Sequence, residues 1–101
     1  MDWSRPAGEI EARLRGFAPW PGAFTTLEGR LLQLVAAEVG DPPGAAGGPG
    51  SAARLAGRGL AVTCGGGTVL LVTRVRPEGR PAQEALAFLN GLRRDAVTLG
   101  T

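Results

Sequence analysis

Apolar residues recur at helical spacing in the first seventeen positions of the chain. Successive apolar side chains are three, four and three residues apart, which places them on one face of a helix: Ala7, Ile10, Leu14 and Phe17. Ser4 is the expected N-cap of this helix, and Gly16 stands where a glycine commonly follows the last helical residue. The pattern predicts a helix between Ser4 and Gly16.

Shorter apolar runs follow, and glycine or proline separates them. Residues 23–27 and 30–39 flank a tight turn at Glu28-Gly29 and predict a hairpin; residues 31–37 alone are also compatible with a helix, but the hairpin context favours a strand. The segments Gly57-Arg58-Gly59 and Gly65-Gly66-Gly67 then mark turns between further strands. These strands are predicted at residues 51–55, 60–64, 68–75 and 97–99.

The remaining segments predict one more helix and two connectors. Residues 83–92 have a helical apolar face, and Gly91 leads us to expect that the helix ends at Asn90. Residues 76–81 are a proline-bounded connector. Residues 40–50 contain five glycines and three prolines, so we expect a mobile surface loop. Short strands separated by glycine turns indicate a barrel or a sandwich, in one domain spanning residues 1–101.

The segment from Arg15 to Phe24 holds three of the five aromatic residues and two prolines. Each proline has a φ near −65° and keeps the residue before it extended, so Ala18 and Trp20 are expected to be extended. Trp20 then either fills a small core or offers a platform for a base or a sugar. The residue types favour the core.

Composition excludes most catalytic chemistry. The chain has 101 residues, no histidine and one cysteine, so the usual zinc ligand sets and the commonest general base are missing. Cys64 is expected to be a small buried residue, and a lone cysteine is compatible with a reducing, cytoplasmic location. Gly65-Gly66-Gly67 lacks the Lys-Ser/Thr of a phosphate-binding loop. We therefore expect no catalysis, no metal, no cofactor and no membrane segment.

Charge is distributed unevenly along the chain. The formal net charge is +2, and all 11 basic residues are arginines. Residues 1–50 carry a net charge of −2, whereas residues 51–101 carry +4. A basic second half is a weak indication of nucleic-acid binding.

Several motifs, in order along the chain, resemble the C-terminal domain of methionyl-tRNA formyltransferases. The most specific is the segment Arg-Gly-Phe-Ala-Pro-Trp-Pro-Gly, whose fold-defining residues are Arg15, Gly16, Phe17, Pro19, Trp20, Pro21 and Gly22. The other matching segments are residues 3–7, 27–29, 49–50, 77–80 and 88–91. Lysines that the family often carries after the Glu-Gly turn are replaced here by Leu31, Gln33 and Val35.

The resemblance implies a mainly β fold: a small, open, OB-fold-like Greek-key barrel with an N-terminal and a C-terminal helix. It also implies a non-catalytic accessory domain, which binds tRNA (initiator methionyl-tRNA in this family) through a basic surface. The Rossmann-like catalytic domain that precedes this barrel in the family is absent here, and would act in cis or in trans.

Two functions are compatible with these features. In the first, arginines contact RNA phosphates; the candidates are Arg30, Arg58, Arg74, Arg76, Arg80, Arg93 and Arg94. In the second, the barrel binds no RNA and only supports a protein partner, as in related barrels of formyltransferases that act on nucleotide-sugars or formyl-folate. An arrangement of these arginines along one surface favours the first function.

Overall fold

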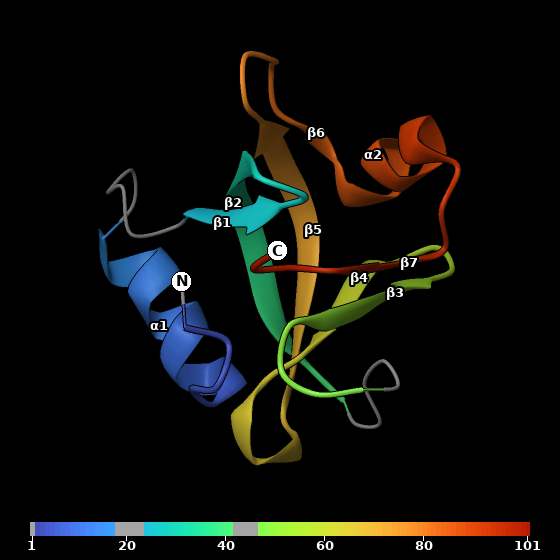
Figure 1. Ribbon diagram of the computed structural model, residues 1–101. Helices are drawn as coiled ribbons and strands as arrows, with labels where there is room; N and C mark the ends of the chain where they lie inside the picture. The colour runs from blue at the N-terminus through green and yellow to red at the C-terminus, as the bar shows by residue number, and fades with distance from the viewer. Residues whose placement is uncertain (1, 18–23, 42–46) are drawn as a thin grey trace.

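The computed structural model describes residues 2–17, 24–41 and 47–101, with the side chains of residues 15–17 left out. The described chain is mainly β and confirms the expected fold class: seven strands form one curled, half-barrel sheet, flanked by two helices (Figure 1). A short 3₁₀ turn occupies Gly65–Gly67. The elements are α1 (Ala7–Phe17), β1 (Phe24–Leu27), β2 (Arg30–Gly40), β3 (Ser51–Leu55), β4 (Gly59–Thr63), β5 (Val69–Pro77), β6 (Gln83–Glu84), α2 (Ala85–Leu92) and β7 (Ala96–Thr98).

The strands are antiparallel and lie in the order β1-β2-β5-β4-β3-β7, with β6 paired to β5. The chain after β7 returns to the opposite edge, where the Gly100 N–H donates to the Thr26 carbonyl at 2.7 Å. The Gly29 N–H likewise donates to the Thr101 carbonyl at 3.0 Å. Figure 1 shows this return as the red segment that crosses in front of β2 and β5. These bonds bring the two edges of the sheet together.

Apolar side chains from the concave side of the sheet form the core. The most completely buried large residues are Leu32, Leu34, Leu60, Val62, Leu70, Val72, Val75 and Leu89. Trp3 closes this core and is only 6% exposed, and its indole N–H donates to the hydroxyl of Thr25. Among the described residues, no buried side-chain nitrogen or oxygen lacks a hydrogen-bond partner.

The first helix starts and ends later than the sequence predicts. Ser4 is not its N-cap, because α1 begins at Ala7 and the Ser4 hydroxyl donates to the Asp2 carboxylate instead. The Ala7 N–H donates to the hydroxyl of Thr68 at 2.8 Å, so the residue just before β5 satisfies the helix terminus. Gly16 does not terminate α1, which continues to Phe17. A glycine inside a helix costs about 1 kcal/mol relative to alanine, and helices tolerate this.

The boundaries of the second helix also differ from the prediction. Gln83 and Glu84 form β6 rather than the first helical turn, because Glu84 has extended backbone angles and pairs with Arg74 on β5. The helix passes through Gly91 and ends at Leu92, and Arg93 caps it in the left-handed conformation with a φ of 57°. Residues 76 and 77, expected in a connector, belong to β5.

Parts of the glycine-rich segment at residues 40–50 are built into the fold, contrary to the expectation of a mobile loop throughout. Gly40 ends β2. Gly50 is buried, donates its N–H to the Thr63 carbonyl and accepts a hydrogen bond from the Leu99 N–H. A Cβ atom at Gly50 would lie 2.7 Å from the Leu99 carbonyl oxygen, so only glycine fits. Residues 42–46 lie outside the described part.

Most of the fold-defining motif also lies outside the described residues. Pro19, Trp20, Pro21 and Gly22 are not described, so the role expected for Trp20 stays a prediction. The backbones of Arg15, Gly16 and Phe17 form the last turn of α1.

Candidate nucleic-acid interface

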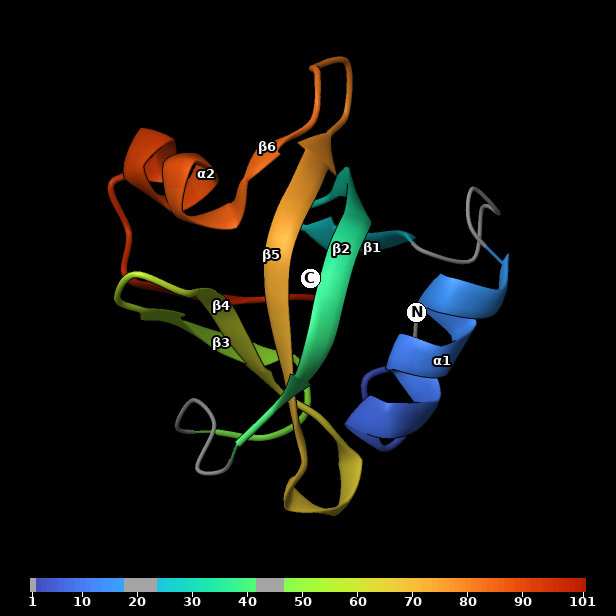
Figure 2. The same cartoon turned by 180° about the vertical axis from the view of Figure 1, so that it is seen from behind.

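Three separate segments meet at one end of the half-barrel and enclose a cleft. They are the turn between β1 and β2, the turn between β5 and β6, and helix α2, which all lie at the upper end of the molecule in Figures 1 and 2. The cleft has a volume of about 430 Å³. Its floor and walls combine leucines, one aromatic ring and three arginines.

Local backbone geometry positions each side of this cleft. Glu28 and Gly29 have φ angles of 52° and 82°, as the tight β1–β2 hairpin requires, and they place Arg30 at the first position of β2. On the other side, Gly79 has a φ of 73°, and the Arg80 N–H donates to the Pro77 carbonyl. The Glu78 N–H donates to the Leu31 carbonyl at 3.1 Å, which ties the β5–β6 turn to the start of β2.

Five of the seven arginines expected to contact RNA lie around this end of the barrel. Arg30, Arg80 and Arg94 line the cleft. The Nε of Arg76 donates to the Arg80 carbonyl at 3.3 Å, and Arg93 precedes Arg94 in the chain after α2. We call these five residues the arginine cluster: Arg30, Arg76, Arg80, Arg93 and Arg94.

Most members of the cluster lack an acidic partner. Among the side chains that the structure describes, no carboxylate lies within 4.0 Å of Arg30, Arg76, Arg80 or Arg93. Arg94 is the exception, because its Nη1 contacts the Glu28 carboxylate. Exposed guanidinium groups without an acidic partner are available to bind an external anion.

The other two predicted arginines already have acidic partners. Arg58 lies in the β3–β4 turn, and its Nη2 is 3.5 Å from the Glu38 carboxylate. Arg74 lies on β5, and its Nη1 is 3.2 Å from the Glu84 carboxylate. The structure therefore places neither of them among the free cations of the cluster.

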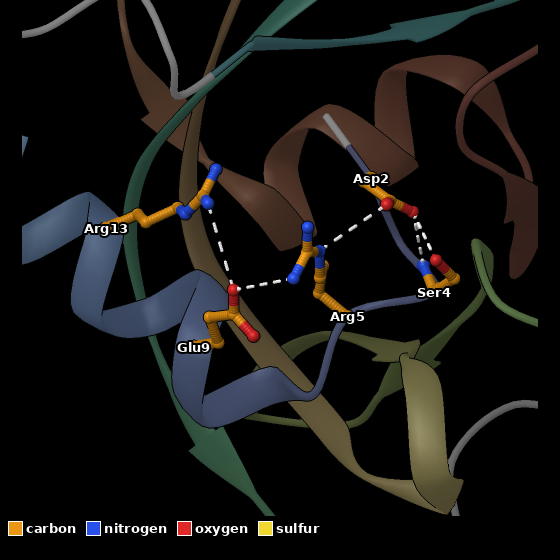
Figure 3. Close-up of polar contacts among 5 residues, drawn as sticks. All are labelled: Asp2, Ser4, Arg5, Glu9 and Arg13. Carbon is orange, nitrogen blue, oxygen red and sulfur yellow. Dashed lines mark hydrogen bonds and ion pairs between the residues drawn. The ribbon is translucent and has the colours of Figure 1, made fainter.

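Arg5 and Arg13, in the first helix region, belong to a separate, neutralised network. Glu9 lies 3.3 Å from Arg5 and 3.8 Å from Arg13, and Arg5 is also close to Asp2 (Figure 3). The Ser4 hydroxyl and the Ser4 N–H donate to the Asp2 carboxylate and lower its pKa from the ordinary value of an aspartate. Helix α1, which carries Glu9 and Arg13, packs beside β2 (Figure 1), and no residue of this network lines the cleft.

Sequence reasoning missed one residue that supports the cluster. Arg54, on β3, places its Nε 2.9 Å from the Asp95 carboxylate, and its Nη2 donates to the Arg94 carbonyl at 3.4 Å. The Arg54 N–H also donates to the Asp95 carbonyl at 2.7 Å. Arg54 thus holds the segment that carries Arg93 and Arg94. No local pattern indicates a contact between residues 41 positions apart.

Two further features have structural roles. Cys64 is 1% exposed, as expected of a small core residue, and burial raises the pKa of its thiol to about 11. The glycines at 65–67 form the turn between the antiparallel strands β4 and β5, and the Gly65 N–H donates to the Arg5 carbonyl.

The side chains described here contain no group of three His, Cys, Asp or Glu residues suited to a metal ion. Neither helix is long and apolar enough to cross a membrane.

Comparison with known proteins reveals a family match over almost the whole chain. The family model "Formyl transferase, C-terminal domain" matches residues 1–93. A methionyl-tRNA formyltransferase from Anaeromyxobacter sp. (strain K) is 62% identical over 100 residues, which cover 98% of this chain and 32% of that protein.

More distant relatives carry the same name. The methionyl-tRNA formyltransferase of Gluconacetobacter diazotrophicus is 46% identical over 101 residues, 100% of this chain and 30% of that protein. That of Myxococcus xanthus is 43% identical over 91 residues, 90% of this chain and 28% of that protein. The chain thus spans about a third of the length of the curated relatives it matches.

Proposed function

This chain belongs to the formyl transferase C-terminal domain family, and on that premise we propose that it is the tRNA-binding part of a methionyl-tRNA formyltransferase. It performs no catalysis itself. A formyltransferase catalytic domain, in cis or in trans, carries out formyl transfer in the cytoplasm while this barrel holds the tRNA. The curated relatives, whose name includes both the reaction and the tRNA, support this assignment.

The observation that carries the proposal is the arginine cluster. Four of its five guanidinium groups lack an acidic partner among the described side chains. The four residues come from two strands, one turn and the end of a helix, and the fold brings them to one end of the barrel. A guanidinium group pairs with a phosphate through two parallel hydrogen bonds, and such contacts position a nucleic acid without reading its sequence. The cluster therefore suits the backbone of a folded RNA, and initiator methionyl-tRNA is the substrate that the family implies.

A titration of labelled tRNA with this chain tests the proposal. Fluorescence anisotropy at 50 and 200 mM salt should show affinity falling by about 50- to 150-fold if four phosphates are neutralised. Initiator and elongator tRNAs should bind this chain alike. The double variant R30Q/R80Q should reduce the slope of log K against log salt by about 1.4 to 1.8, because two phosphate contacts are lost.

The matched control is R5Q/R13Q, which removes the same charge from the ion-paired network beside α1. It should leave both the affinity and the salt slope close to those of the unmodified chain. If the two double variants lose tRNA affinity equally, net charge and not the cluster determines binding.

The second candidate function is a barrel that supports a protein partner and binds no RNA. The observation in its favour is the exposure of two leucines at the same cleft, 46% for Leu31 and 37% for Leu92. An absence of tRNA binding at 50 mM salt would select this function.

A further inference from the structure

We propose that the cleft holds one unstacked nucleotide of the bound RNA, with its base on the apolar floor and its phosphate between Arg30 and Arg80. This inference rests on the proposed tRNA binding. It adds a site for a single base to what is otherwise a sequence-tolerant contact with the RNA backbone.

The floor of the cleft has the size and the surface that a base requires. A volume of about 430 Å³ falls within the range of sites that hold small molecules. Leu27 and Leu32 are buried beneath it, whereas Leu31 and Leu92 are substantially exposed. Phe88 adds an aromatic ring on which a base can stack, and this contact tolerates every base because each has a π face.

The charges around the cleft favour a nucleotide over an apolar peptide. Arg30 begins β2 on one side and Arg80 lies in the β5–β6 turn on the other, and neither has a described carboxylate within 4.0 Å. An apolar peptide would cover the leucines but leave both cations without a partner. A nucleotide satisfies both features, since its base contacts the floor and its phosphate binds the guanidinium groups.

Polar side chains at the rim suit the edge of a base. The amide of Gln83 both donates and accepts hydrogen bonds, and the carboxylate of Glu78 accepts them from an exocyclic amino group. Glu28, the other carboxylate of the cleft, is already bound to Arg94. In a double helix the bases are stacked and paired, so only an unpaired nucleotide can reach the floor.

Two probe RNAs distinguish this site from backbone binding. One is a fully paired hairpin stem, and the other is the same stem with a four-nucleotide single-stranded 3′ extension that contains 2-aminopurine. We expect the extension to raise the affinity of the chain by about fivefold or more, the order expected of one stacked base. The fluorescence of 2-aminopurine should change on binding.

The variant L31S/L92S makes the exposed part of the floor polar and should abolish both the gain in affinity and the fluorescence change. Binding of the fully paired stem should stay the same. The control L55S changes a leucine at the end of β3, outside the cleft, whose exposure of 41% lies between those of Leu31 and Leu92, and it should behave like the unmodified chain. Circular dichroism melts verify folding, and the single variants L31S and L92S replace the double variant if it unfolds.

The outcomes separate this inference from the proposed function. Equal affinity for the two RNAs, with R30Q/R80Q weakening both, would overturn the nucleotide site and leave tRNA binding intact. Absence of any RNA binding would overturn both. If L31S/L92S binds both RNAs normally but the full-length enzyme with these changes loses the contact between its domains, the cleft is a protein-docking surface and the nucleotide site is wrong.

Discussion

The indole Nε1 of Trp3 lies 3.0 Å from the hydroxyl oxygen of Thr25, and this hydrogen bond ties the chain before α1 to strand β1 inside the core. Both side chains are buried, at 6% and 4% exposure. A buried donor that loses its acceptor retains its desolvation cost, so removing this acceptor should lower stability by more than the net contribution of an ordinary hydrogen bond.

The variant T25V should therefore lower the free energy of unfolding by about 1–3 kcal/mol, because valine has nearly the same shape but leaves the indole N–H without a partner. Urea denaturation followed by tryptophan fluorescence measures this change. T26V, at the next position of β1, is the control and should change stability by less than about 0.5 kcal/mol. Equal effects of the two variants would mean that the Trp3 bond contributes nothing specific.

The order of most elements could be predicted from the sequence, because most have a local signal; β6 is the exception, since its two residues were predicted as part of a helix. Periodicity marks α1, and the Glu28-Gly29 turn marks the β1–β2 hairpin. The closure of the half-barrel could not be predicted, since it depends on bonds such as those from Gly100 to Thr26 and from Gly29 to Thr101, between residues far apart in the chain.

The candidate site shows the same division. The basic character of the second half indicated six of the seven candidate arginines, and five of the seven, including Arg30 from the first half, lie at one end of the barrel. The ion pairs that remove Arg58 and Arg74 from the free set depend on Glu38 and Glu84, and only the folded sheet brings these residues together.

Gly65 should be the least replaceable glycine of the β4–β5 turn. A Cβ atom there would lie 1.7 Å from the Ser4 carbonyl oxygen, whereas a Cβ atom at Gly66 would meet nothing within 4 Å. We expect G65A to displace the segment that carries Trp3 and to lower stability by about 3 kcal/mol or more, since backbone atoms must move.

The matched variant G66A should cost about 1–2 kcal/mol, because alanine at a φ of 70° is strained even in open space. Thermal melts and the tryptophan emission maximum separate the two cases. A red-shifted emission should appear in G65A alone. If G65A has the same melting temperature as G66A and keeps the native emission maximum, the close contact with Ser4 does not determine stability.

Stability should fall in alkaline solution because of Cys64. Burial favours the neutral thiol and raises its pKa from 9.0 to about 11, so unfolding allows the thiol to ionise once the pH exceeds 9. The stabilisation is complete below pH 9 and is lost as the pH rises toward 11, by an amount on the order of 2 kcal/mol. The chain has no lysine or tyrosine, so no other side chain titrates in this window.

Urea midpoints measured between pH 8 and pH 10.5 test this prediction, and the C64A variant is the control. C64A should be less stable at pH 8 because it leaves a small cavity, but its stability should vary little over this range. If the urea midpoints of the unmodified chain and of C64A fall equally as the pH rises, a group other than Cys64 causes the alkaline sensitivity.

Arg54 should influence RNA binding through the segment that it holds. The R54Q variant removes the guanidinium contacts to the Asp95 carboxylate and the Arg94 carbonyl, so the chain after α2 becomes less constrained. Because the ion pair is partly exposed, the loss of stability should be less than about 1 kcal/mol. We nevertheless expect tRNA affinity to fall about threefold, on the order of the 0.5–1 kcal/mol that orders one flexible side chain at an interface.

R58Q is the charge-matched control, because Arg58 is also ion-paired but contacts Glu38 on β2 rather than the segment after α2. Hydrogen exchange distinguishes positioning from a simple loss of charge. The amide of Arg54 bonds to the Asp95 carbonyl, and its exchange should accelerate in R54Q but not in R58Q. Equal losses of affinity in the two variants, with unchanged exchange at residue 54, would show that Arg54 acts only through its charge and does not position Arg93 and Arg94.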